Sequence, residues 1–174
     1  MATTKWTLDP THSEVLFKVK HLMITNVTGS FPVIKAEIET EGTDFSKGKV
    51  SFTADVASVT TNNEQRDGHL KGADFFEVDK FPTIQFESTA FDVTNSKIKG
   101  NLTIKGITKP VTLDAEFHGI NKDPWGNEKA GFSVSGKIHR KDWDLNWNAA
   151  LETGGVLVSD DVKISADVQF VKAA

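Results

Sequence analysis

The sequence has 174 residues, no cysteine and a formal net charge of −4. A chain of this length can bury a sizeable core, and we expect residues 1–174 to form one domain. The lack of cysteine excludes disulfides, thiolate catalysis and thiolate metal sites. The acidic balance argues against a nucleic-acid partner, which would require a basic face.

The N-terminus, MATTKWTLD, has no apolar stretch ahead of the first expected strand. We therefore expect no secretory signal and a cytoplasmic protein, or a periplasmic one if a signal has been removed. No apolar run approaches the length of a membrane span, so no membrane-spanning segment is expected.

Most of the chain alternates apolar and polar residues, which is typical of strands that cover a core on one side only. In residues 14–20, for example, Val15, Phe17 and Val19 fall on one face and lysines fall on the other. The alternation recurs in residues 34–39, 49–56, 84–88, 98–104, 111–117, 132–138 and 162–170. It predicts an all-β fold of antiparallel strands.

Residues 60–86 break this alternation. Asn62 and Asn63 are good helix N-caps, and apolar residues recur at helical spacing from Leu70 onward. The segment ends before Pro82, because the residue ahead of a proline is pushed out of the helical region. We predict one amphipathic helix inserted between two strands.

Two features favour an extended eight-stranded antiparallel β-barrel over a sandwich. The strands are long, about nine to ten residues, so each spans roughly 30 Å. Small residues also fall at inward positions and would leave room for one small ligand. The alternative is that these residues fit a tapered, filled core. The small inward residues are Gly100, Gly136, Ala36, Ala54, Ala115 and Ala166.

Several motifs, taken in order, resemble the YceI-like family of lipocalin-like polyisoprenoid-binding proteins. The resemblance runs from about Trp6 to Phe170. The motifs are WTLDPTHS at 6–13, VxFxVxHLM at 15–23, GxF at 29–31, NxxRDxHL at 63–70, DFF at 74–76, GxLTIxGITxPV at 100–111 and WxLNWN at 143–148.

This resemblance implies a lipocalin-like barrel that the helix closes at one side. It also implies an apolar tunnel that holds a long isoprenoid, and often a homodimer. Because no signal peptide is expected, the chain resembles the cytoplasmic branch of the family.

The candidate tunnel lining consists of large apolar residues on the inward faces, in the helix segment and in the irregular region after residue 143. Core packing is the alternative for each of them. These residues are Phe17, Val19, Phe31, Phe52, Leu70, Phe75, Phe76, Phe86, Leu102, Phe132, Ile138, Leu145, Trp147 and Ile164.

Candidate contacts to a polar head group are Arg66, His69 and Arg140, since arginine grips phosphate with two donors. The alternative is structural ion pairing. In that case Arg66 would pair with Asp67 or Asp74, and Arg140 would pair with Asp142.

No metal, cofactor or catalytic group is expected. None of the five histidines shows metal-ligand spacing. We expect His12, His21 and His69 to tie the barrel end to the helix through hydrogen bonds. Ser13 and His12 are neighbours on a strand and point to opposite faces, so they cannot act as nucleophile and base.

The predicted function is to bind and sequester or carry an elongated isoprenoid, a polyprenyl chain or an isoprenoid quinone, with the helix as a lid. One alternative is a stress-response protein that binds diverse amphiphiles, including fatty amides. The others are a filled barrel that acts as an interaction domain, and a hydrolase.

Overall fold

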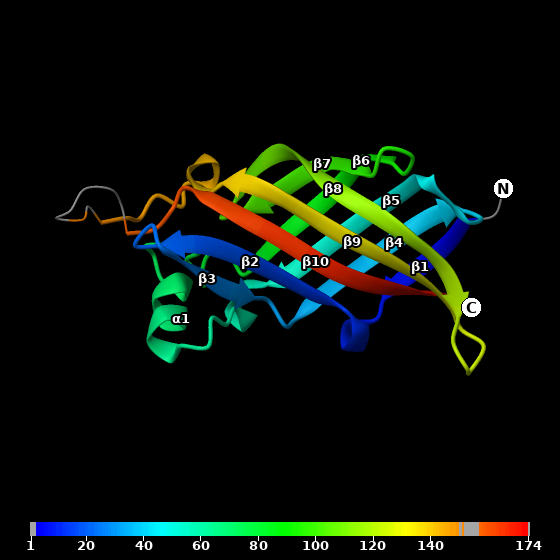
Figure 1. Ribbon diagram of the computed structural model, residues 1–174, viewed down its shortest axis with the longest axis horizontal. Coiled ribbons are helices and arrows are strands. Elements are labelled where there is room, and N and C mark those ends of the chain that lie inside the picture. Colours follow the sequence, from blue (N-terminus) through cyan, green and yellow to red (C-terminus); the bar gives the residue numbers. More distant parts are fainter. Residues whose placement is uncertain (1–2, 150, 152–156, 174) are drawn as a thin grey trace.

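The computed structural model describes residues 3–149, 151 and 157–173. Its strands are β1 Thr3–Leu8, β2 Glu14–His21, β3 Thr25–Ser30, β4 Ile34–Glu41, β5 Asp44–Asp55, β6 Thr83–Asp92, β7 Lys97–Ile104, β8 Ile107–Lys122, β9 Glu128–His139 and β10 Asp161–Lys172. They form one antiparallel sheet in the order β1-β4-β5-β6-β7-β8-β9-β10-β2-β3, and β1 also pairs with β10 (Figure 1). Eight strands therefore close into a barrel, as predicted, while β2 and β3 extend from its β10 edge.

Strands β1 and β2 share one edge of β10. Leu8 pairs with Phe170 near one end of β10, and Phe17 pairs with Ile164 nearer the other. Between them the chain makes a 3₁₀ helix, Pro10–His12, whose N-cap Asp9 accepts a hydrogen bond from the Thr11 amide. Residues 14–20 form a strand, as the alternation predicts, but β1 and not β2 completes the ring of eight strands.

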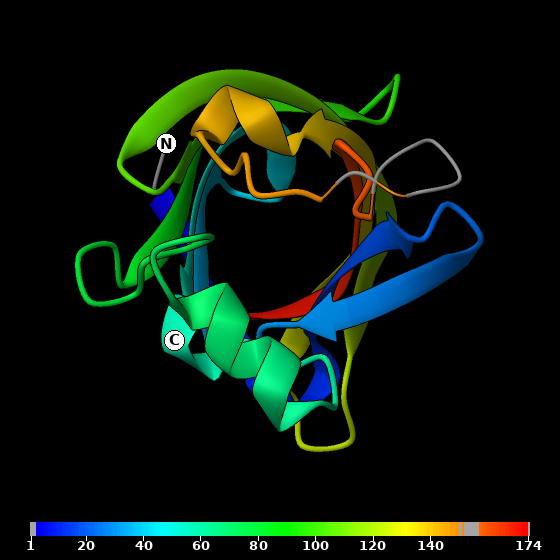
Figure 2. The same ribbon diagram turned by 90° about the vertical axis from the view of Figure 1, so that its left-hand side faces the viewer.

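The predicted helix is confirmed as α1, Glu64–Lys71, and is shorter than its apolar spacing suggested. Asn63 is the N-cap and accepts a hydrogen bond from the Arg66 amide at 2.9 Å. The helix ends at Gly72, and the next turn folds back so that the Phe76 amide donates to the Leu70 carbonyl. The helix is polar and has no buried residue, so the prediction that it is amphipathic is wrong, and Phe75 and Phe76 reach the barrel from the turn that follows it. The helix lies at one end of the barrel, along one side of the opening (Figure 2).

The opposite end of the barrel is filled by side chains. Phe132 is 5.1 Å from Phe117 and 5.2 Å from Phe45 between ring centroids, and Trp6 is 5.2 Å from Phe45. Trp6 is fully buried and donates its indole N–H to Thr40. We call this cluster the aromatic plug; it consists of Trp6, Phe45, Phe91, Phe117, Phe132 and Phe170.

Two more 3₁₀ helices follow, Val56–Ser58 after β5 and Arg140–Trp143 after β9. Trp143 is buried and donates its indole N–H to the Leu102 carbonyl at 2.9 Å, which fixes this segment to the end of β7. A helical turn expected over residues 148–152 is not formed at Asn148 and Ala149, and most of the remainder lies outside the described residues.

Candidate functional site

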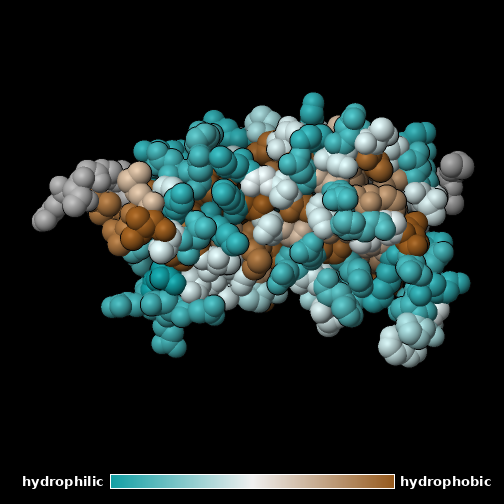
Figure 3. Space-filling model, viewed as in Figure 1, coloured by the Kyte–Doolittle hydropathy of each residue, from teal (hydrophilic) through white to brown (hydrophobic). Residues whose placement is uncertain are grey.

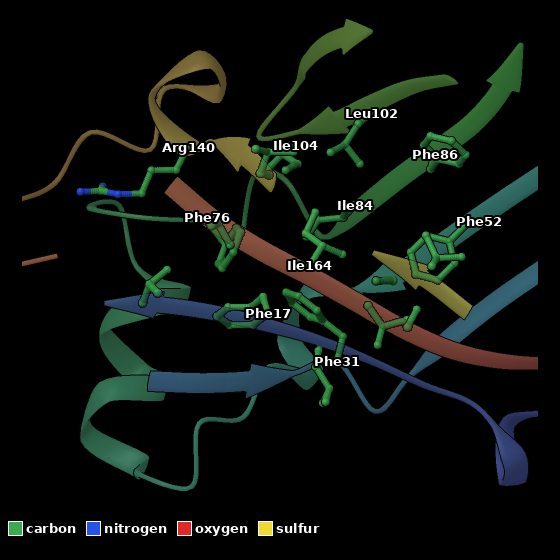
Figure 4. A pocket seen from close by; sticks show the side chains of 18 of the residues that line it. Phe17, Phe31, Phe52, Phe76, Ile84, Phe86, Leu102, Ile104, Arg140 and Ile164 are labelled. Atoms are coloured by element: carbon green, nitrogen blue, oxygen red, sulfur yellow. The ribbon is translucent and has the colours of Figure 1, made fainter. Parts of the chain in front are cut away.

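A cavity of about 620 Å³ lies inside the barrel, between the aromatic plug and α1 (Figure 4). Several side chains that point into the barrel, among them Phe17, Phe52 and Ile164, are only half-buried because they face open space. Phe17, Phe52, Phe86 and Phe132 all line the cavity, and among the aromatic pairs of the described residues none joins two of these four.

The structure brings every candidate tunnel residue to the wall of this cavity. A role of these residues in ligand binding stays a prediction. They are Phe17, Val19, Phe31, Phe52, Leu70, Phe75, Phe76, Phe86, Leu102, Phe132, Ile138, Leu145, Trp147 and Ile164.

Glycines keep the cavity open, but not by leaving empty space next to them. The Phe86 ring lies over Gly100, where a β-carbon would come within 2.5 Å of Cζ. Leu113 covers Gly136 and Phe17 covers Gly29 in the same manner. Because each large side chain lies flat against a neighbouring strand, it leaves the middle of the barrel free. The expectation that Gly100 and Gly136 themselves supply the room is wrong in this respect.

Aromatic contacts attach the segment after α1 to the barrel. Phe31, which follows β3, is 5.4 Å from Phe17 and makes an edge-to-face contact of 5.9 Å with Phe76. Such pairs add to the stability gained from burial alone. Through Phe76, the turn after α1 thus lines the cavity and packs on Phe31, which in turn packs on Phe17 of β2.

A second aromatic cluster lies at the rim of the cavity. The His69 ring is perpendicular to Trp147 at 4.8 Å and to Phe75 at 5.0 Å. His69 Nε2 also lies 2.9 Å from an Asp74 carboxylate oxygen. This rim cluster, His69, Phe75 and Trp147, joins the end of α1 to the segment after the 3₁₀ helix Arg140–Trp143.

Arg140 is held by backbone carbonyls and not by Asp142. Its guanidinium donates to the carbonyls of Leu145 at 2.5 Å, Trp147 at 2.8 Å and Ser159 at 2.8 Å. Its nearest carboxylate is Asp160, at 3.9 Å. The residue is 3% exposed, and this burial lowers the pKa of Arg140, while the Asp160 charge partly offsets the effect. Figure 4 shows the guanidinium turned away from the cavity centre. Arg140 therefore fixes the rim segments in place.

Arg66 also differs from the expected ion pairs. It donates from Nε to the Thr61 hydroxyl at 2.7 Å and from Nη2 to the Thr61 carbonyl at 2.8 Å. Asp67 accepts from the amide and the hydroxyl of the same Thr61. Burial would raise the pKa of Asp67, but these two hydrogen bonds lower it below its usual range. Arg66 remains exposed at the rim, with one guanidinium nitrogen unused by these bonds.

The charges that line the cavity are all basic. Lys20, Arg66 and Arg140 contribute, and no Asp or Glu is among the described lining residues. The sequence reasoning missed Lys20 because alternation placed it on the outer face of β2. Leu157 and Val158 also lie at the rim, where the Leu22 amide donates a hydrogen bond to the Leu157 carbonyl and His21 pairs with Val158.

The histidines follow the expectation only in part. His69 lies at the end of α1 and contacts the rim segment, as expected. His12 instead bonds to Asp9 and Thr11 within its own turn, so its predicted contact with the helix is wrong.

Within the described part of the chain, no three His, Asp or Glu side chains are grouped so that they could hold a metal ion. No helix in that part is long and apolar enough to cross a bilayer.

Comparison with known families gives a match to the YceI-like domain over residues 6–170. The chain belongs to the YceI-like family. A UPF0312 protein of Staphylococcus aureus strain N315 is 45% identical over 168 residues, which cover 96% of this chain and 97% of that protein.

Solved structures of the same fold include the YceI protein of Campylobacter jejuni. It is 35% identical, with a TM-score of 0.76 over 89% of this chain and 90% of that one. A domain from Saccharophagus degradans described as polyisoprenoid-binding is 15% identical, with a TM-score of 0.71 over 97% of this chain and 98% of that one, and so supports the fold alone. These relatives agree with a lipocalin-like barrel closed by one helix.

Proposed function

We propose that this YceI-like protein binds an elongated isoprenoid lipid, a polyprenyl chain or an isoprenoid quinone, inside the barrel and sequesters or carries it. The observation that carries the proposal is the apolar cavity of about 620 Å³ between the aromatic plug and α1. Its volume is in the range of about 300–1,000 Å³ typical of ligand sites. The polyisoprenoid binding named for the Saccharophagus degradans domain points to the same ligand class.

The mostly apolar side chains of the cavity wall favour a long hydrocarbon tail over a compact polar ligand. A buried methylene-sized carbon contributes ~0.8 kcal/mol, so one five-carbon unit contributes roughly 4 kcal/mol before the costs of binding. A few units therefore suffice for tight binding. Tail length is then selected by the depth from the rim cluster to the aromatic plug, and no single contact decides it.

The rim would meet the head group. Arg66 is the candidate with an unused guanidinium nitrogen, and His69 lies one helical turn further along α1. A quinone carbonyl or a phosphate oxygen accepts a hydrogen bond from arginine. Arg140 is not assigned this role, because its donors are already bound to carbonyls.

The test is native mass spectrometry of the protein after gentle purification, followed by titration of delipidated protein with an isoprenoid quinone. We expect a co-purified hydrophobic mass and quenching of tryptophan fluorescence, since Trp147 lies at the rim. Protein that is uniformly free of ligand and ignores added quinone contradicts the proposal. Comparable affinities for unrelated fatty amides would favour the broad amphiphile binder.

Two neighbouring residues of β10 provide matched variants. Ala166 lines the cavity, whereas Ser165 is exposed on the outer face of the barrel. Ala166→Phe should fill part of the cavity and weaken quinone binding by about tenfold or more, because overpacking leaves no room for the tail. Ser165→Phe adds the same ring outside and should leave the affinity unchanged. Equal affinities for both variants would place the ligand elsewhere.

A further inference from the structure

The turn between β2 and β3 exposes three apolar side chains in succession. Leu22 is 40% exposed, Met23 57% and Ile24 77%. We call these residues the hairpin tip. They form an apolar patch at the left end of the molecule in the view of Figure 3, where the hairpin also ends in Figure 1.

The backbone of the hairpin tip is unfavourable for these residue types. Leu22 and Met23 have φ angles of 54° and 62°, and the Ile24 amide donates to the His21 carbonyl. A turn with positive φ at both central positions favours Asn-Gly, because larger side chains are strained there. Exposure and strain both disfavour Leu-Met at this turn, so folding alone does not explain their presence.

The hairpin is also basic, in a chain that is acidic as a whole. The sequence has no Asp or Glu between Glu14 and Glu37, whereas it has Lys18 and Lys20 on β2. Both lysines are exposed, and neither forms an ion pair within the described part of the chain. At about 3.3 Å per residue, Lys18 lies roughly 13 Å and Lys20 roughly 7 Å along the strand from Leu22.

Lysines continue across the outer face of the sheet beside the hairpin. Lys18 on β2 pairs directly with Lys163 on β10, and Lys163 pairs with Lys137 on β9. Like charges directly opposite one another destabilise a sheet. Of the three, Lys137 has a carboxylate nearby, Asp161 at 3.7 Å. The strands next to the rim therefore present a row of positive charge that an anionic surface would neutralise.

The hairpin tip is continuous with the opening of the cavity. The Leu22 amide donates to the Leu157 carbonyl at 2.9 Å, and His21 pairs with Val158. His21, Leu157 and Val158 all line the cavity. A lipid that left a bilayer along the tip would thus reach the rim beside Leu157 and Val158.

From these observations we propose that the β2–β3 hairpin is a membrane-docking element. The hairpin tip inserts at the level of the headgroups and upper acyl chains of an anionic bilayer, and Lys18, Lys20 and Lys163 lie against its phosphates. This docking proposal rests on the proposed function, because the bilayer would be the source from which the barrel takes its lipid.

The test is co-sedimentation of the full chain with vesicles that contain no isoprenoid, made of phosphatidylcholine alone or with added phosphatidylglycerol. We expect binding to the anionic vesicles that weakens as salt is raised. The double variant Leu22→Asn, Met23→Gly should bind about tenfold or more weakly, yet be at least as stable to unfolding, because it relieves the strained turn. Lys18→Gln and Lys20→Gln should each weaken binding about fivefold and reduce the preference for anionic lipid.

Trp125 provides a matched control. It is 83% exposed in the loop between β8 and β9, at the opposite end of the barrel (Figure 1). Trp125→Ala should leave vesicle binding unchanged. Wild-type protein that does not sediment, a hairpin-tip variant that binds like wild type, or loss of binding in Trp125→Ala would each overturn the proposal.

Two further outcomes separate this proposal from others. If wild-type protein is a dimer that the tip variant splits while vesicle binding stays intact, the tip is an interface between copies and the docking proposal is wrong. If the tip variant loses vesicle binding but still takes up quinone from detergent solution, both proposals are supported. Vesicle binding by a protein that ignores quinone in detergent supports docking and contradicts only the proposed function.

Discussion

The ring of Phe17 on β2 occupies the place where a β-carbon on its cross-strand partner Gly29 would lie. The same ring is 5.4 Å from Phe31, which in turn contacts Phe76 of the segment after α1. A glycine on β3 therefore sets the position of an aromatic wall, and this wall supports the cover of the cavity.

Gly29→Ala should force Phe17 away from β3 and into the cavity. Overpacking of this kind costs about 1–3 kcal/mol of unfolding free energy, and we also expect weaker quinone binding. Urea unfolding and quinone titration measure the two effects. Adding Phe17→Ala should relieve the clash, so that the double variant is as stable as Phe17→Ala alone. Unchanged stability and affinity in Gly29→Ala would show that the ring does not depend on the glycine.

Gly68→Ala tests a glycine with the opposite environment. Gly68 is within α1, and a β-carbon there would meet no atom within 4 Å. Alanine is favoured over glycine in a helix by about 0.5–1 kcal/mol, so the variant should be more stable by up to that amount. Thermal unfolding measures the gain. Quinone affinity should not fall, and a destabilised variant would mean that α1 is not a regular helix at this position.

Arg140 should be required for the shape of the rim. Arg140→Met leaves the carbonyls of Leu145, Trp147 and Ser159 without their donor, and we expect a loss of about 3 kcal/mol or more in unfolding free energy. Arg140→Lys should rescue it only in part, since an ammonium cannot reproduce the planar fork. The exposed neighbour Lys141, 3.3 Å from Asp160, is the control, and Lys141→Met should change stability by less than about 1 kcal/mol. Equal effects at both positions would contradict this role.

Asp9 should make stability depend on pH in the acid range. Its side chain is 13% exposed and lies 2.9 Å from Lys129 Nζ. Hydrogen bonds from Lys129, Thr11 and His12 lower the pKa of Asp9 well below its usual value, although burial opposes them. A carboxylate with a depressed folded pKa contributes stability above its unfolded pKa of ~3.9, and this contribution is lost as the pH falls toward the folded pKa.

Asp9→Asn should therefore be less stable than wild type at pH 7, by about 2 kcal/mol, and the difference should shrink below about pH 4. Urea unfolding across this pH range measures it. A difference that is constant with pH would mean that the loss comes from packing and not from the charge.

Much of the barrel could be predicted because alternation reports directly which face of a strand is buried. β3 could not, since Thr25–Ser30 contains Val27 as its one large apolar residue. The role of β1 could not be predicted either. β1 and β2 pair with different parts of the same edge of β10, and this arrangement depends on tertiary contacts around the turn at Asp9.

The cavity wall followed from the same alternation, whereas the roles of the polar rim residues did not. Sequence neighbours suggested Asp67 or Asp142 as ion partners, but Arg66 and Arg140 bind backbone carbonyls brought close by the fold. The spacing of Leu70 and Phe76 suggested one longer helix. In the structure the chain reverses at Gly72, and the turn places Phe76 over the cavity.

A crystal structure of the protein grown with an isoprenoid quinone tests the central claim most directly. We predict continuous tail density inside the barrel, with the head group near Arg66 and Trp147 and the far end of the tail against Phe132. A quinone bound outside the barrel, or a lumen occupied by the side chains of Phe17, Phe52 and Phe86, would contradict it.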